Sequence, residues 1–182
     1  ENIGLGAPKL KGDIVTISHD EPGHNFLDAV KSDPHVLRGP GEYEIGGVFV
    51  TGVAMHDAET GKQNVAYLFD FDGVTVLHLG DLAHVPDQSA VEELGQVSVL
   101  LVPVGGGGGL KAEEAAEVVA LVEPYFVVPM HYEQAGLPFE LESVDKFLKA
   151  MGVSKPQELD TLKVTAADTP EQPQVVILTP QS

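Results

Sequence analysis

The 182-residue chain carries 28 acidic and 10 basic residues, and its formal net charge of −18 disfavours a nucleic-acid partner or an anionic membrane surface. Hydrophobic residues make up 43% of the chain, enough for the core of one ordinary domain, which we expect to span residues 1–182. The absence of cysteine excludes disulfides, thiolate metal sites and cysteine nucleophiles, and it fits the cytoplasmic location that we expect.

The first half of the sequence predicts short strands joined by tight turns. A β-branched run predicts a buried strand over 13–18, and residues 25–32 resemble a short helix. The pairs Gly46-Gly47 and Asp72-Gly73 are typical of hairpin turns. Around these turns we expect strands over residues 36–37, 43–45, 48–54, 64–71 and 74–79.

The second half predicts helices that alternate with strands. Pro86 favours the start of a helix, because the first turn does not need its missing N–H. The expected helices cover residues 86–94, 111–122 and 141–151, and the expected strands cover 97–104, 125–129 and 175–178. Residues 153–173 resemble a loop. Hairpins followed by this alternation favour an α/β layered sandwich with helices packed on sheets.

Four of the expected strands end in a side chain that can bind metal. His19 follows its strand directly, His56 and Asp81 follow by one residue, and His131 follows by two. In layered α/β folds, sites form in the loops beyond strand ends. Imidazole and carboxylate groups are ligands of zinc, manganese and iron. One such histidine is more often structural, but four strand ends together indicate a metal site.

The residues around these positions resemble the motifs of the metallo-β-lactamase superfamily. Residues 19–24 (His-Asp-Glu-Pro-Gly-His) are similar to its H-x-H-x-D-H motif, and residues 78–81 (His-Leu-Gly-Asp) are similar to its Gly-Asp element. His56 and His131 match its later histidines. Residues 38–47 and 105–109 also resemble the branch near the L-ascorbate-6-phosphate lactonase-like Zn-dependent hydrolases. The resemblance implies an αβ/βα metallo-β-lactamase-like sandwich.

The resemblance also implies that an N-terminal segment is missing from this single domain. The superfamily's first strands precede the H-x-H-x-D-H motif by several dozen residues, whereas 18 residues precede His19 here. We expect such a gap to leave a sheet edge or an apolar face that can pair with another chain. A homo-oligomer is compatible with this expectation.

Two residues depart from the superfamily pattern. Glu21 stands where the second motif histidine is expected, and Gly23 stands where the motif aspartate is expected. Carried over residue by residue, the resemblance implies one metal site at His19 and His56 with Glu21 as a substitute ligand. A second, weaker site would use His24 and His131, and Asp81 would bridge the two ions. Zinc is the expected metal, with manganese or iron as alternatives.

The implied activity is hydrolysis, in which a metal-bound hydroxide attacks a small ester, lactone or phosphoester. Asp81 would hold the metal and orient the nucleophile. His84 is a candidate for proton transfer, against the alternative that it is a surface residue. Glu21 and Gly23 leave a second hypothesis open, a catalytically impaired member that serves as a binding or assembly scaffold. The five retained ligands favour the enzyme, with a small molecule as substrate and neither nucleic acid nor membrane as partner.

The glycine run at 105–109 lies between a strand and a helix and invites comparison with a phosphate-binding loop. Leu110 separates the run from Lys111, no Ser or Thr follows, and the G-x-x-x-x-G-K spacing is absent. We therefore interpret the run as a flexible loop at the rim of the site.

Overall fold

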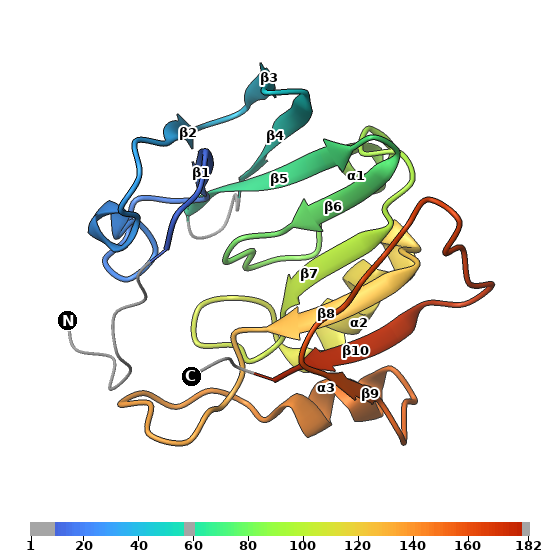
Figure 1. Ribbon diagram of the computed structural model, residues 1–182. Coiled ribbons are helices and arrows are strands. Elements are labelled where there is room, and N and C mark those ends of the chain that lie inside the picture. Colours follow the sequence, from blue (N-terminus) through green and yellow to red (C-terminus); the bar gives the residue numbers. More distant parts are fainter. Residues whose placement is uncertain (1–9, 57–60, 180–182) are drawn as a thin grey trace.

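The computed structural model describes residues 10–56 and 61–179, with His56 described by its backbone only. An eight-stranded sheet in the order β3-β4-β5-β6-β7-β8-β10-β9 dominates the fold, and β1 and β2 form a separate parallel pair (Figure 1). The strands are β1 (Ile14–Ile17), β2 (His35–Arg38), β3 (Gly41–Ile45), β4 (Val48–His56), β5 (Gln63–Phe71), β6 (Val74–His78), β7 (Val99–Pro103), β8 (Phe126–Met130), β9 (Gln157–Leu159) and β10 (Gln174–Leu178). The helices are the 3-10 turn η1 (Leu27–Ala29) and α1 (Gln88–Glu92), α2 (Ala112–Val122) and α3 (Val144–Ala150).

Two-residue turns connect β3 to β4 and β5 to β6 in the antiparallel half of the large sheet, as the sequence predicted. Strand β3 pairs with β4 up to Ile45 opposite Val48, and β5 pairs with β6 up to Phe71 opposite Val74. At the second turn Asp72 and Gly73 have φ values of 55° and 89°. These left-handed conformations suit the right-handed twist of a hairpin, which explains the Asp-Gly pair.

The other half of the sheet is largely parallel, and this arrangement positions the site. Strands β6, β7 and β8 run parallel, so their carboxyl ends meet at one edge of the sheet (Figure 1). The loops that follow them carry Asp81, residues 105–109 and His131. The β1–β2 pair is tied to this edge because the Val65 N–H donates to the carbonyl of Ser18 at 2.9 Å.

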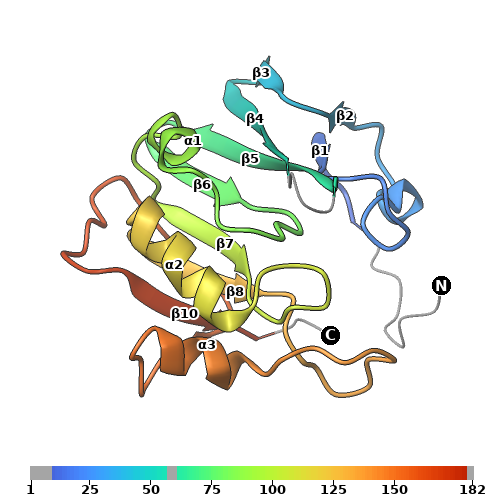
Figure 2. The ribbon, with the colours of Figure 1, turned by 180° about the vertical axis from the view of Figure 1, so that it is seen from behind.

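The main core lies between the large sheet and the three helices, which cover one face of it (Figure 2). Helix α2 buries Ala115, Val118, Val119 and Val122, an apolar stripe with helical spacing. The polar residues of α2 face water. A smaller cluster on the other face of the sheet is partly covered by Leu162 and Val164, from the connection between β9 and β10.

The predictions for two segments, residues 25–32 and 153–173, were wrong. Residues 25–32 form the single 3-10 turn η1 and not a helix, which fits the high cost of nucleating a helix in so short and polar a segment. Residues 153–173 are not all loop, because β9 pairs in parallel with β10 at the edge of the sheet. Its three residues, Gln-Glu-Leu, are too few and too polar to give an alternating pattern.

Within residues 10–56 and 61–179, no helix combines the length and apolarity that a bilayer crossing requires.

Candidate metal centre

The loops after β1 and β6 bring three metal-binding side chains together. His19, His24 and Asp81 each offer one ligand atom, and these atoms lie within 4.8 Å of one another. The two imidazole rings are tilted, with their centroids 4.4 Å apart. In the sequence, His24 lies 5 residues after His19 and 57 residues before Asp81. The three side chains meet because the loops after β1 and β6 lie at one edge of the fold.

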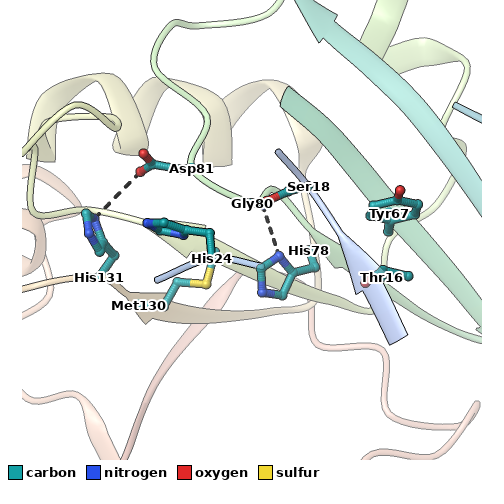
Figure 3. A pocket seen from close by; sticks show the side chains of 9 residues that line it. All are labelled: Thr16, Ser18, His24, Tyr67, His78, Gly80, Asp81, Met130 and His131. Atoms are coloured by element: carbon teal, nitrogen blue, oxygen red, sulfur yellow. Dashed lines mark hydrogen bonds and ion pairs between the residues drawn. The ribbon is translucent and has the colours of Figure 1, made fainter. Parts of the chain in front are cut away.

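His131 lies beside this group, from the end of β8 (Figure 3). Its Nδ1 atom is 3.8 Å from Asp81 Oδ1, and its ring centroid is 6.2 Å from that of His24. The φ angle of His131 is 53°, a conformation that few non-glycine residues adopt. A Cβ atom on Gly105 would lie 2.2 Å from the His131 carbonyl oxygen, so the loop after β7 needs glycine to pack against this residue.

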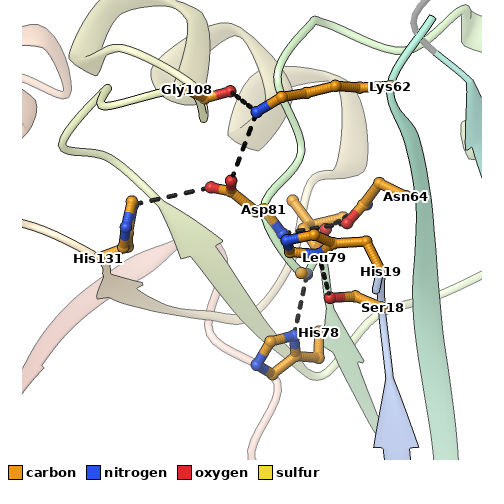
Figure 4. A network of polar contacts seen from close by, with 10 residues as sticks. Ser18, His19, Lys62, Asn64, His78, Leu79, Asp81, Gly108 and His131 are labelled. Carbon is orange, nitrogen blue, oxygen red and sulfur yellow. Dashed lines mark hydrogen bonds and ion pairs between the residues drawn. The ribbon is translucent and has the colours of Figure 1, made fainter. Parts of the chain in front are cut away.

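A buried amide holds the turn that presents Asp81 (Figure 4). Asn64, only 6% exposed, donates from Nδ2 to the Leu79 carbonyl at 2.8 Å and accepts the Asp81 N–H at 3.1 Å. Gly80 lies between these two residues with φ of 64°, and a Cβ atom there would come within 2.4 Å of Asn64 Oδ1. The loop after β7 also closes on the turn, since a Cβ atom on Gly109 would lie 2.5 Å from Asp81 Oδ1.

Several polar atoms at the centre are buried without a hydrogen-bond partner, namely His19 Nε2, Asp81 Oδ1, His84 Nδ1 and His131 Nδ1. The other ring nitrogen of His19 lies 2.9 Å from Ser18 Oγ, which orients the ring and leaves Nε2 for a ligand. A buried unsatisfied polar group costs about 1–3 kcal/mol. Nitrogen and carboxylate donors of this kind fit a zinc-like cation, which would give a partner to His19 Nε2 and to the Asp81 carboxylate.

The electrostatic environment favours neutral imidazole, the form that binds metal. Burial lowers the pKa of His19, and the neighbouring His24 lowers it further, while Asp81 and Glu21 act in the opposite direction. Burial also lowers the pKa of His131, against the raising effect of Asp81. Both rings are therefore prepared to coordinate a cation without first losing a proton at neutral pH.

Two cavities share Asp81 as a wall. The larger has a volume of about 350 Å³ and is bounded by His24, His78 and His131 (Figure 3). The smaller, of about 160 Å³, is bounded by His19, Lys62 and His84 among others. Asp81 thus lies between the two cavities.

The remaining predicted residues have different positions. Glu21 is exposed, lines the smaller cavity and lies outside the group of three, so its role as a ligand stays a prediction. His84 lines the same cavity with a buried, unpartnered Nδ1, which keeps it a candidate for proton transfer. The side chain of His56 lies outside the described residues. Gly23 has φ of 96°, a conformation that disfavours the aspartate of the superfamily pattern.

Two side chains at the centre, Asn64 and Lys62, were not predicted from the sequence. Lys62 Nζ lies 4.0 Å from Asp81 Oδ2 and donates to the Gly108 carbonyl at 3.4 Å (Figure 4). The one signal for Asn64 is an amide within the otherwise apolar strand Asn-Val-Ala-Tyr-Leu-Phe. Lys62 precedes that strand and has no distinguishing pattern around it.

Comparison with known proteins places this geometry in a family. The profile described as "Beta-lactamase superfamily domain" matches residues 1–131, more than half of the chain. A candidate Zn-dependent hydrolase of the metallo-β-lactamase superfamily from Thermotoga maritima has a similar structure, with a TM-score of 0.79 and 36% identity over 94% of this chain and 84% of that one.

Curated relatives agree with the structural match. A UPF0173 metal-dependent hydrolase from Thermococcus kodakarensis is 36% identical over 115 residues, 59% of this chain and 51% of the relative. One from Pyrococcus abyssi is 38% identical over 130 residues, 68% of this chain and 57% of the relative. The chain therefore spans about half the length of these relatives. With its parallel strand ends, its His19–His24–Asp81 group and these matches, the chain belongs to the metallo-β-lactamase superfamily.

Proposed function

We propose that the chain forms the metal centre of a metal-dependent hydrolase that acts on a small ester, lactone or phosphoester, with zinc as the metal. The observation that carries this proposal is the set of buried, unpartnered ligand atoms that converge on Asp81. The similarity to metal-dependent hydrolases from Thermococcus kodakarensis and Pyrococcus abyssi supports it.

The residues have separate roles in this proposal. His19, His24 and Asp81 would hold the cation, and His131 is close enough to join them. A divalent cation in such a site lowers the pKa of a water ligand toward about 7 and stabilises negative charge on the reacting group. Asn64 keeps Asp81 in place, and the loop with Gly105 and Gly109 packs against the centre.

His84 is suited to move a proton at the edge of the centre. It lines the cavity that also contains His19 and Asp81, and its Nδ1 atom is buried without a hydrogen-bond partner. A histidine within reach of a reacting group can act as general acid or base near neutral pH. We assign it the transfer of a proton to the leaving group.

The scaffold hypothesis is kept because of Glu21. It is exposed and lies outside the compact ligand group, so the site would have one imidazole fewer than the superfamily pattern. A protein that retained the fold for assembly alone would tolerate this change. The two hypotheses differ in whether bound metal supports turnover.

The test is hydrolysis by protein that has been stripped of metal and reloaded with zinc. We expect 4-nitrophenyl acetate or bis(4-nitrophenyl) phosphate to be hydrolysed only after reloading, and Asp81→Ala to lose at least about 100-fold of that rate. Asp87→Ala, an exposed carboxylate on the same connection, is the matched control and should retain the rate. Zinc bound without turnover would favour the scaffold, and no zinc bound by the wild type would contradict the metal centre itself.

A further inference from the structure

A lysine lies at the edge of the metal centre. Lys62 Nζ is 4.0 Å from Asp81 Oδ2, and the side chain is 39% exposed, so it borders both the carboxylate and the solvent. It lines the cavity of about 160 Å³ together with His19 and His84. The ammonium group is thus placed where a substrate in that cavity would meet it.

The fold sets the position of this lysine. Lys62 directly precedes β5, the strand whose Asn64 holds the Asp81 turn. On its other side the loop after β7 approaches closely, because the Gly108 carbonyl accepts from Lys62 Nζ at 3.4 Å and a Cβ atom on Gly108 would lie 3.0 Å from it. The same strand therefore fixes both Asp81 and the ammonium group.

The charge of Lys62 is unusual in its surroundings. The chain has a formal net charge of −18, which repels anions at long range. Of the described residues that line the two cavities next to Asp81, Lys62 is the only lysine or arginine. The ammonium group of Lys62 therefore favours the binding of an anionic substrate group next to it, although the protein as a whole repels anions.

The cavity favours a small group with a single negative charge. Its volume of about 160 Å³ has room for roughly five water-sized groups. Asp20 and Glu21 line it as well, and their carboxylates would repel a dianionic phosphate more strongly than a carboxylate.

We propose that Lys62 binds a carboxylate group of the substrate, so that the substrate class is a small ester or lactone that carries one carboxylate. This inference rests on the proposed hydrolase function and adds a specificity-determining residue to it. Because Lys62 Nζ lies 4.0 Å from Asp81 Oδ2, a substrate carboxylate bound to the ammonium group would lie close to Asp81. The ester or lactone group of a small substrate would then lie beside the metal ligands.

The experiment compares two esters that differ in charge. Zinc-loaded wild type, Lys62→Gln and Lys62→Arg are assayed with 4-nitrophenyl acetate and with the mono-4-nitrophenyl ester of glutarate. We expect a KM about tenfold lower for the glutarate ester in the wild type, loss of this preference in Lys62→Gln and partial retention in Lys62→Arg. Lys155→Gln, an exposed lysine that lines neither cavity, should keep the preference.

A binding measurement identifies the anion without turnover. Butyrate and inorganic phosphate are titrated calorimetrically into the same four zinc-loaded proteins. Butyrate should bind more tightly than phosphate, and Lys62→Gln should weaken butyrate binding about tenfold. Phosphate binding that is tighter and depends on Lys62, or butyrate binding that Lys62→Gln leaves unchanged, would overturn the carboxylate assignment.

The two proposals can fail separately. If zinc-loaded wild type hydrolyses both esters equally well, the function stands and the role of Lys62 is refuted. If it hydrolyses neither ester but binds butyrate through Lys62, the anion site stands and the hydrolase function is refuted. An equal loss of kcat/KM for both esters in Lys62→Gln would assign the lysine to the support of Asp81 and also refute the proposal.

Discussion

Replacing Asn64 by leucine should detach Asp81 from the sheet with little change in side-chain volume. The substitution removes the hydrogen bonds to the Leu79 carbonyl at 2.8 Å and from the Asp81 N–H at 3.1 Å. A buried backbone group that loses its partner costs about 1–3 kcal/mol. Two such groups at a partly exposed turn give an expected loss of about 2–4 kcal/mol in the free energy of unfolding.

Asn64→Leu should weaken zinc binding by more than its lower free energy of unfolding alone would explain. Residues that orient a ligand typically contribute about 10–100-fold to metal affinity when mutated. We therefore expect the dissociation constant for zinc to rise by about this factor in Asn64→Leu. The reason is that Asp81 loses the amide that fixes its backbone.

Urea unfolding of the metal-free protein measures the first effect, and competition with a chromophoric chelator measures the second. Val176→Ala is the control, because Val176 is fully buried in β10 and lines neither cavity. It should lose about 1–3 kcal/mol of stability and keep its zinc affinity. If Asn64→Leu binds zinc as tightly as Val176→Ala does, Asn64 does not position Asp81.

Three further predictions concern the loops and histidines of the centre. Gly105→Ala should weaken zinc binding by displacing His131, since the added Cβ would lie 2.2 Å from its carbonyl oxygen; unchanged affinity would refute this contact. Glu21→His should raise zinc occupancy measured by atomic absorption, because an imidazole would restore the superfamily ligand, whereas equal occupancy would mark Glu21 as a loop residue. Burial lowers the pKa values of His19 and His78 in the folded protein from 6.5. As the pH falls, these histidines are therefore protonated in the unfolded chain before they are protonated in the folded protein. The metal-free protein should keep its full stability above about pH 6.5 and lose it below, and urea unfolding that showed rising stability from pH 7 to 5.5 would contradict this.

Local signals were sufficient for most of the fold. Hairpins at Gly46-Gly47 and Asp72-Gly73 depend on residues next to one another, and the structure confirms both. The apolar runs of β7 and β8 are long enough to identify buried strands. Strand β9 has no such signal, since its pairing with β10 depends on the tertiary arrangement and not on its own composition.

Some residues of the candidate site could likewise be predicted from the sequence, and others could not. His19 and Asp81 could be predicted because each follows a recognisable strand, and His24 because it belongs to the same motif as His19; the structure brings the three together. Asn64 and Lys62 could not, because their roles arise from the register of β5 against the turn after β6. Sequence neighbours gave no reason to place an amide and an ammonium group beside Asp81.

We expect one cation to bind among the side chains of His19, His24 and Asp81. Anomalous diffraction at the zinc absorption edge, from crystals of the zinc-loaded protein, would locate it. The dominant peak should lie about 2.0–2.2 Å from a ring nitrogen of each histidine and from an Asp81 carboxylate oxygen. A dominant peak elsewhere, for example at the exposed His35, with none at this centre would contradict it.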